Sequence, residues 1–201
     1  MLTFDAGPHE YKWRGQKVPG VTTIISPLSD WSKVPQDILL SAQMRGTYVH
    51  AMTEAFDNGT LDEGAILEAP EHAIFHGYLR AWKAFCDDVD PVWHEIETMG
   101  YSQSYGFAGT WDRRGELTKR TPGNFLIDIK TAAQSSPSWG PQTAAYRQIR
   151  AELEPTAITD RRGTVQLHAD GTYDFLTWDS PDDWRVFLAC LTIFNHLRAT
   201  K

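Results

Sequence analysis

The heptapeptide FLIDIKT at residues 125–131 places an acid and a base inside an apolar run. Side chains two residues apart on a β-strand point to the same face, so Asp128 and Lys130 project together. Ile127 and Ile129 then project to the opposite face. A buried charge is costly unless it is paired or bound to a metal. Two interpretations are open: an internal ion pair or exposed sheet edge, or an acid–base pair that belongs to a site at the strand end.

A second acid, Asp112, precedes Asp128 by sixteen positions, within GFAGTWDRRGEL at 106–117. If the two strands that carry these residues are neighbours in a sheet, their carboxylates meet. Clustered carboxylates are the ligands that a hard divalent ion such as Mg²⁺ requires, and the ion keeps waters that a substrate phosphate can replace. The alternative for Asp112 is a carboxylate that caps a turn in Asp-Arg-Arg-Gly.

Other polar residues have types suited to such a site. The segment PVWHEIETMGY places Glu95 and Glu97 on one face of a strand, one as a candidate site residue and the other facing solvent. His50 lies inside a predicted helix, where a single histidine is more often structural or exposed. Gln142 and Tyr146 are four residues apart and share one helix face, which is alternatively an ordinary face with the tyrosine in the core.

Hydrophobic periodicity and turn residues predict the elements that must position these side chains. The predicted helices cover 34–57 and three stretches that begin at Pro70, near Pro141 and at Ser180-Pro181. The predicted strands are a hairpin within 9–20 and the segments 92–101, 105–113, 124–131, 156–160, 164–168 and 173–178, with a loop at 61–69 and turns at Arg14-Gly15, Arg162-Gly163 and Asp170-Gly171. This order predicts a mixed β-sheet flanked by helices, an α/β or α+β fold, in a single domain over residues 1–201.

Composition and charge restrict the classes of protein to consider. The 201 residues, 41% hydrophobic and 22% charged, are ordinary for one globular domain with a core. No apolar run reaches the ~18 residues of a membrane span, and the N-terminus lacks a signal-peptide pattern. The net charge of −7 argues against a protein that coats nucleic acid with its whole surface. Cys86 and Cys190 lack metal-type spacing, so we expect no iron–sulfur cluster, and two isolated cysteines fit a cytoplasmic protein. Because no apolar run is long enough to span a bilayer, we expect no membrane partner.

Together these motifs resemble the PD-(D/E)XK nuclease superfamily, and within it the RecB-like and phage exonuclease branch, over roughly residues 18–150. RGTYVH resembles the helical motif that supplies a histidine ligand, and ETMGYSQSYGFAGTWD resembles the glutamate strand followed by Gly-x-x-Asp. IDIKT resembles the Asp-x-Lys core, and QTAAY resembles the Gln-x-x-x-Tyr helix motif. The resemblance implies a restriction-endonuclease-like core. Because the chain has no helicase motifs, it also implies a small stand-alone nuclease of the kind that phages carry, in the cytoplasm of a bacterial host.

The same resemblance implies that the protein hydrolyses DNA with Mg²⁺, or with Mn²⁺ as a substitute. Asp112 and Asp128 would ligate the metal, with His50 as a third ligand and the backbone carbonyl of Ile129 as a further one. Lys130 would orient the attacking water and stabilise the charge that develops on the phosphate.

Three further site residues follow from the resemblance. Glu97 would position a water, hold a second metal or steady the motif lysine. Gln142 and Tyr146 would hold the nucleic-acid backbone or support that lysine from the facing helix.

The basic residues next to these motifs are expected either to line a phosphate track or to be solvated surface residues: Arg113, Arg114, Lys119, Arg120, Arg147 and Arg150.

The sequence is compatible with more than one function and more than one kind of partner. The resemblance alone favours an exonuclease over an endonuclease, in DNA recombination, repair or processing. The alternatives are a catalytically inactive DNA-binding or assembly protein with the same fold, a metal-dependent hydrolase of small phosphoesters, and an accidental motif match. DNA is the expected partner, and a homo-oligomer or a recombination partner protein is compatible with the resemblance, although no sequence feature demonstrates either.

Overall fold

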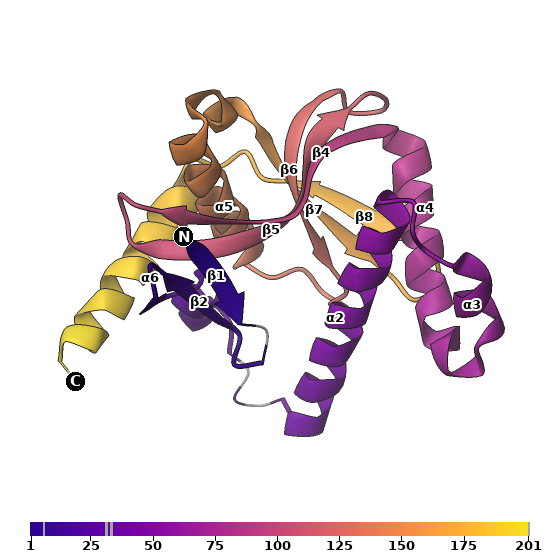
Figure 1. The fold of residues 1–201 in the computed structure, drawn as a ribbon, viewed down its shortest axis with the longest axis horizontal. Helices are drawn as coiled ribbons and strands as arrows, with labels where there is room; N and C mark the ends of the chain where they lie inside the picture. Colours follow the sequence, from indigo (N-terminus) through magenta and orange to yellow (C-terminus); the bar gives the residue numbers. More distant parts are fainter. Residues whose placement is uncertain (6, 31, 33, 201) are drawn as a thin grey trace.

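The computed structural model describes residues 1–5, 7–30, 32 and 34–200 and is built around a five-stranded sheet (Figure 1). The strands lie side by side in chain order: β4 (Pro91–Ser102), β5 (Phe107–Leu117), β6 (Gly123–Lys130), β7 (Arg161–Leu167) and β8 (Tyr173–Thr177). Neighbouring strands are antiparallel except β6 and β7, which are parallel. A parallel pair needs a crossover connection, and the helix α5 lies in that connection. The predicted mixed sheet flanked by helices is confirmed, in its α+β form.

Helices cover both faces of this sheet. They are α1 (Val21–Ile24), α2 (Gln36–Asp57), α3 (Glu63–Glu68), α4 (His76–Val89), α5 (Trp139–Leu153) and α6 (Asp182–Ala199), with 3-10 turns at Ser26–Leu28, Pro70–Phe75 and Pro155–Thr159. Figure 1 shows α2 and α4 on one side of the sheet, and α5 and α6 on the other. None of the helices in the described part of the chain is both long enough and apolar enough to cross a bilayer.

The alternation of side chains along β6 decides which residues enter which core. Ile127 and Ile129 are fully buried and pack in the cluster that α2 and α4 cover. Leu126 packs on the other face, in the cluster that contains residues of α1, α5 and α6. Asp128 and Lys130 share the face of Leu126, because they follow it at intervals of two residues. The predicted separation of the acid and the base from the two isoleucines is therefore confirmed.

A second, smaller sheet precedes the central one and consists of β1 (Leu2–Asp5), β2 (Glu10–Trp13) and β3 (Gln16–Val18). The β2–β3 hairpin turns at Arg14 and Gly15, whose φ angles of 52° and 81° suit a two-residue turn of type I′. This confirms the predicted hairpin, whereas β1 was not predicted. The chain that follows β3 is tied to β5, because the N–H of Ala108 donates to the carbonyl of Pro19 at 2.9 Å.

Two predictions in the helical part of the chain need correction. The predicted loop at 61–69 contains α3, and the side chain of Asp62 caps this helix by accepting the N–H of Ala65 at 3.0 Å. The predicted helix from Pro70 begins as a 3-10 turn and becomes an α-helix at His76.

Two predictions near β7 are also wrong. Residues 156–160 do not form a strand; Pro155–Thr159 is a 3-10 turn that begins with proline at its first position. The strand β7 begins at Arg161, so Arg162-Gly163 is not a turn. A β-carbon at Gly163 would lie 2.5 Å from the ring of Phe175, so the glycine permits a close contact between β7 and β8.

Candidate metal centre

One pocket of about 540 Å³ collects most of the residues that the sequence singles out. Its walls come from the N-terminal sheet, α1, α2, β4, β5, β6 and α5. The predicted site residues that line it are His50, Glu97, Asp112, Asp128, Lys130, Gln142 and Tyr146.

Three of these residues form a group that could hold a metal ion. The Nδ1 atom of His50 lies 3.3 Å from Oδ1 of Asp112 and 3.6 Å from Oε1 of Glu97. One ligand atom from each residue lies within 4.8 Å of the other two. An imidazole and two carboxylates converging in this way, from α2, β4 and β5, are chemically suited to a divalent transition metal.

The carboxylate of Asp112 also joins its strand to the next one. The N–H of Ile129 donates to Oδ2 of Asp112 at 2.5 Å, while Oδ1 faces His50. Burial by itself would raise the pKa of Asp112, but the adjacent His50 holds it below the ordinary value. The structure thus gives the main chain of Ile129 a role in fixing Asp112, whereas its predicted role as a carbonyl ligand stays a prediction.

Asp128 and Lys130 form an ion pair beside the triad of His50, Glu97 and Asp112. The two charged groups are 2.8 Å apart, from Nζ to Oδ2, and Asp128 is almost fully buried. Burial raises the pKa of Asp128 to about 6, although Lys130 opposes the shift. Asp128 lines the same pocket but is not part of the three-residue group, so its predicted role as a direct ligand stays a prediction.

Gln142 and Tyr146 lie on one face of α5, as predicted, and this face lines the pocket. The Nε2 group of Gln142 donates to the hydroxyl of Tyr146 at 2.9 Å. Burial raises the pKa of the Tyr146 hydroxyl, which is therefore neutral and can still donate a hydrogen bond. A β-carbon at Gly109 would lie 2.6 Å from the ring of Tyr146, so this glycine on β5 leaves the space that the ring occupies.

Glu97 adopts an uncommon backbone conformation inside a strand. Its φ is 44°, in the left-handed region that residues with a side chain rarely enter. The paired positions on either side, Ile96 with Arg113 and Thr98 with Trp111, keep one register around it. Such a conformation costs on the order of 1–3 kcal/mol and persists only where surrounding contacts impose it. Glu95 instead accepts hydrogen bonds from Trp111 and Arg150, and lies outside the group of three ligands.

The contacts that hold Glu97 centre on Arg113, and they overturn its predicted role in binding phosphate. The side chain of Arg113 is 0% exposed, so it cannot line a surface track. Its Nη1 group donates to Oε1 of Glu97 at 3.0 Å, and its Nε group donates to Asp57 at 2.6 Å. Its Nη2 group donates to Thr53 at 3.1 Å, and the Thr53 hydroxyl donates to the carbonyl of His50 at 3.0 Å. Its Nη1 group also donates to the carbonyl of Asp112 at 2.6 Å, so Arg113 links all three candidate ligands through the interior.

Arg114 and Arg147 also make internal contacts. Arg114 donates to the carboxylate of Asp160 at 2.6 Å, and Arg147 donates to the carbonyl of the same residue at 3.3 Å. Neither is among the described residues that line the pocket. Of the arginines predicted to bind phosphate, Arg113 and Arg114 are thus used in internal ion pairs, and Arg147 in a hydrogen bond to a main-chain carbonyl.

Sequence reasoning missed two contributions to this region. Asp57 lies seven residues after His50, which places both on one face of α2, and this spacing could have indicated a shared role. The aromatic wall supplied by Phe4, His9 and Tyr11 gave no recognisable signal, because these residues reach the pocket only through the packing of the small sheet.

The titration of His50 predicts how the metal-free protein responds to pH. Burial alone would lower the pKa of His50, but Asp112 and Glu97 raise it from 6.5 to about 10. The folded state therefore binds more protons than the unfolded chain between these values, and the stability that His50 contributes is lost as the pH rises through this window. Asp128, raised from 3.8 to about 6, acts with the same sign at lower pH.

We therefore expect the melting temperature of the protein in chelator to fall as the pH rises from 6.5 to 10. Thermal unfolding followed by circular dichroism measures this dependence. His50→Gln should flatten it in that window, and a melting temperature that rises with pH in the wild type would contradict the assignment.

A comparison with protein-family models finds no match for this chain, and a comparison with curated proteins finds none either.

Proposed function

We propose that the protein is a metal-dependent nuclease of the PD-(D/E)XK type, with a restriction-endonuclease-like core. The observation that carries this proposal is the convergence of His50, Glu97 and Asp112, within one pocket that also holds the Asp128–Lys130 pair. These residues come from four separate elements, and a core stabilised only by packing has no need to gather so many charges in one place.

The donor set indicates which metals the site would accept. His50, Glu97 and Asp112 would hold the ion, and Asp128 lines the same pocket. When bound, a divalent cation would polarise the phosphate and lower the pKa of a water. Imidazole is a better ligand for transition metals than for Mg²⁺, so Mn²⁺ should support activity at lower concentration than Mg²⁺ does.

Lys130 would stabilise the phosphate charge that develops during cleavage. Its ammonium group is held beside Asp128, 2.8 Å away, at the pocket wall. We expect Lys130→Met to lower kcat by about 100-fold, the loss typical of one removed electrostatic donor, while the Mn²⁺ affinity measured by calorimetry changes little. Lys17→Met is the matched control, because Lys17 is exposed and lies outside this pocket. Equal kcat values for the two variants would remove Lys130 from the mechanism.

The direct test of the proposed function is an assay of wild-type protein with Mn²⁺ or Mg²⁺ on end-labelled linear, circular and single-stranded DNA. Metal-dependent cleavage supports a nuclease, and resistance of circular DNA supports the exonuclease that the resemblance favours. Cleavage of nucleotides but not of DNA would identify a small phosphoester hydrolase. Metal-independent binding of DNA without cleavage would identify an inactive DNA-binding protein.

A further inference from the structure

The pocket has a second wall that plays no part in holding a metal. Phe4 on β1, His9 before β2 and Tyr11 on β2 line it together with the triad residues. The ring of Phe4 meets that of His9 edge-on, with centroids 5.0 Å apart, and meets that of Tyr11 at 4.7 Å. Phe4 nevertheless keeps 37% of its surface exposed, so this aromatic ring is presented to whatever enters the pocket.

This aromatic wall is fixed in position relative to the candidate ligands. Tyr11 is buried, and its hydroxyl is 2.8 Å from the hydroxyl of Thr110, two residues before Asp112 on β5. Gly20 packs under the Tyr11 ring, where a β-carbon would lie 3.1 Å from a ring atom. Because Gly20 also forms a bridge with Ala108, the small sheet is anchored to the strand that carries Asp112. Figure 1 shows β1 and β2 beside β5, across from α2.

The charge distribution of the molecule suggests how such an aromatic wall would contribute to binding a nucleic acid. The net charge is −7, and Arg113 and Arg114, two of the arginines predicted to attract phosphate, are used in internal ion pairs. Among the described residues that line the pocket, Lys130 is the only lysine or arginine that could attract a phosphate. Stacking of a base on an aromatic ring does not depend on net charge, and it contributes substantially to the binding of single strands.

The size of the pocket restricts what can use both walls together. A volume of about 540 Å³ is that of a pocket for one small ligand. A single nucleotide whose phosphate lies at the triad and whose base reaches Phe4 would use both walls. We propose that Phe4, supported by His9, is a stacking platform for an unpaired nucleobase next to the scissile phosphate. The preferred substrate is accordingly a single strand or an unpaired end. This inference rests on the proposed nuclease function and names its substrate class.

The test compares Phe4→Ala, Phe4→Leu and Phe4→Trp with wild type on a fluorescent single-stranded oligonucleotide in Mn²⁺. We expect Phe4→Ala to raise KM at least about tenfold with little change in kcat, because one stacked base is lost. Phe4→Leu keeps apolar bulk without a π-face and should behave like Phe4→Ala, whereas Phe4→Trp should restore the wild-type KM. An oligonucleotide with an abasic position at the cleaved site should raise the KM of the wild type to that of Phe4→Ala.

Two controls separate stacking from a structural role. Thr3→Ala changes an exposed neighbour on the same strand and should leave KM unchanged. The Mn²⁺ affinity of Phe4→Ala, measured by calorimetry, should equal that of wild type; a lost metal site would show that Phe4 only supports the fold and would overturn the inference.

The outcomes also separate this inference from the proposed function. If wild type cleaves DNA but Phe4→Ala has the same KM, or if duplex and single strand are cleaved equally well, the stacking platform is refuted and the nuclease stands. If wild type cleaves no nucleic acid in Mn²⁺, both proposals fall together.

Discussion

Asp112→Asn is expected to reduce metal-dependent cleavage by about a thousandfold or more, because a metal contributes several kcal/mol to transition-state stabilisation and each 1.36 kcal/mol is about tenfold in rate. The carboxylate of Asp112 faces His50 with one oxygen and accepts the N–H of Ile129 with the other. Asparagine has the same shape but offers no charge and a single acceptor oxygen. Isothermal titration with Mn²⁺ should show that binding is lost together with activity.

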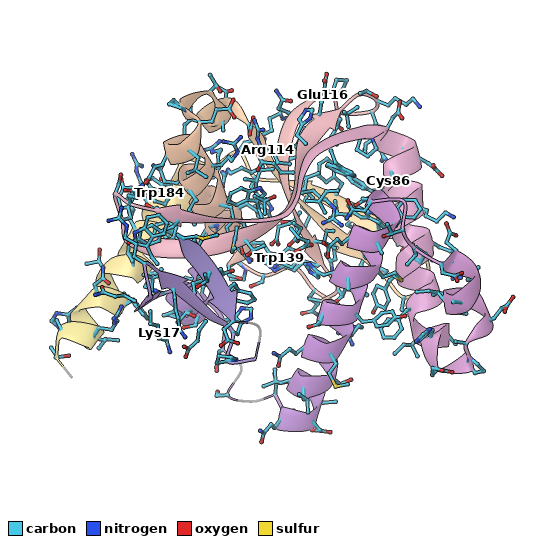
Figure 2. The ribbon with its side chains drawn as sticks, viewed as in Figure 1. Lys17, Cys86, Arg114, Glu116, Trp139 and Trp184 are labelled. Atoms are coloured by element: carbon cyan, nitrogen blue, oxygen red, sulfur yellow. The ribbon has the colours of Figure 1, made fainter. Side chains whose placement is uncertain are left out.

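Glu116→Gln is the matched control for this substitution. Glu116 lies on the same strand and is exposed (Figure 2). Its change to glutamine removes one negative charge, as Asp112→Asn does. Activity and metal affinity should both stay near those of wild type. If Asp112→Asn still bound Mn²⁺ with the wild-type affinity, the metal would have to lie elsewhere, and the proposed centre would be wrong.

Arg113→Met is expected to lower the free energy of unfolding by about 3–5 kcal/mol, the cost of removing one partner from a buried ion pair. The guanidinium of Arg113 and the carboxylate of Asp57 are 2.6 Å apart, with side chains 0% and 3% exposed. Methionine fills similar space but leaves the buried carboxylate without its cation, although Trp82 still donates to it at 3.1 Å. Urea denaturation followed by fluorescence measures the change.

Two further variants show whether the buried charge causes the loss. Adding Asp57→Asn to Arg113→Met removes the unpaired charge and should recover part of the stability. Arg185→Met breaks an exposed pair with Asp182 and should cost less than about 1 kcal/mol. Arg113→Met should also weaken Mn²⁺ binding, because Glu97 loses a contact that holds it in its unfavourable backbone conformation. A loss no larger than that of Arg185→Met would mean that the network contributes little.

The sequence predicted most of the elements that build the site. The structure has β4, β5, β6 and α2 close to their predicted positions, because the apolar residues and flanking turn residues of these segments agree with their tertiary surroundings. The predictions failed where the local signal was short or ambiguous. Residues 156–160 have strand-like composition, but Pro155 starts a 3-10 turn, and the helix at 63–68 has only six residues.

The predictions for the site residues were correct about which residues line the pocket and wrong about Arg113, and the difference has a physical reason. His50, Glu97, Asp112, Asp128 and Lys130 do line one pocket. Spacing along a strand or helix fixes the face on which each residue lies, and the packing of four elements brings these faces together. The predicted phosphate contact of Arg113 was wrong, because the same spacing does not reveal whether a face is covered. Arg113 lies next to Asp112 on β5, and its contacts with Asp57 and Thr53 on α2 and with the ring of Trp82 on α4 make it an interior residue.

By itself, then, the sequence determined the faces: the acid and base on one side of β6, the isoleucines on the other, and His50 on the same side of α2 as Asp57. The face on which each side chain lies follows from the geometry of its own strand or helix and does not depend on how that element packs. The tertiary structure decided which charges meet, which arginines are buried, the strained conformation of Glu97, and the aromatic wall that the small sheet brings to the pocket. Those features depend on the register and packing of segments far apart in the chain, which arise from the sum of many weak contacts and leave no local pattern.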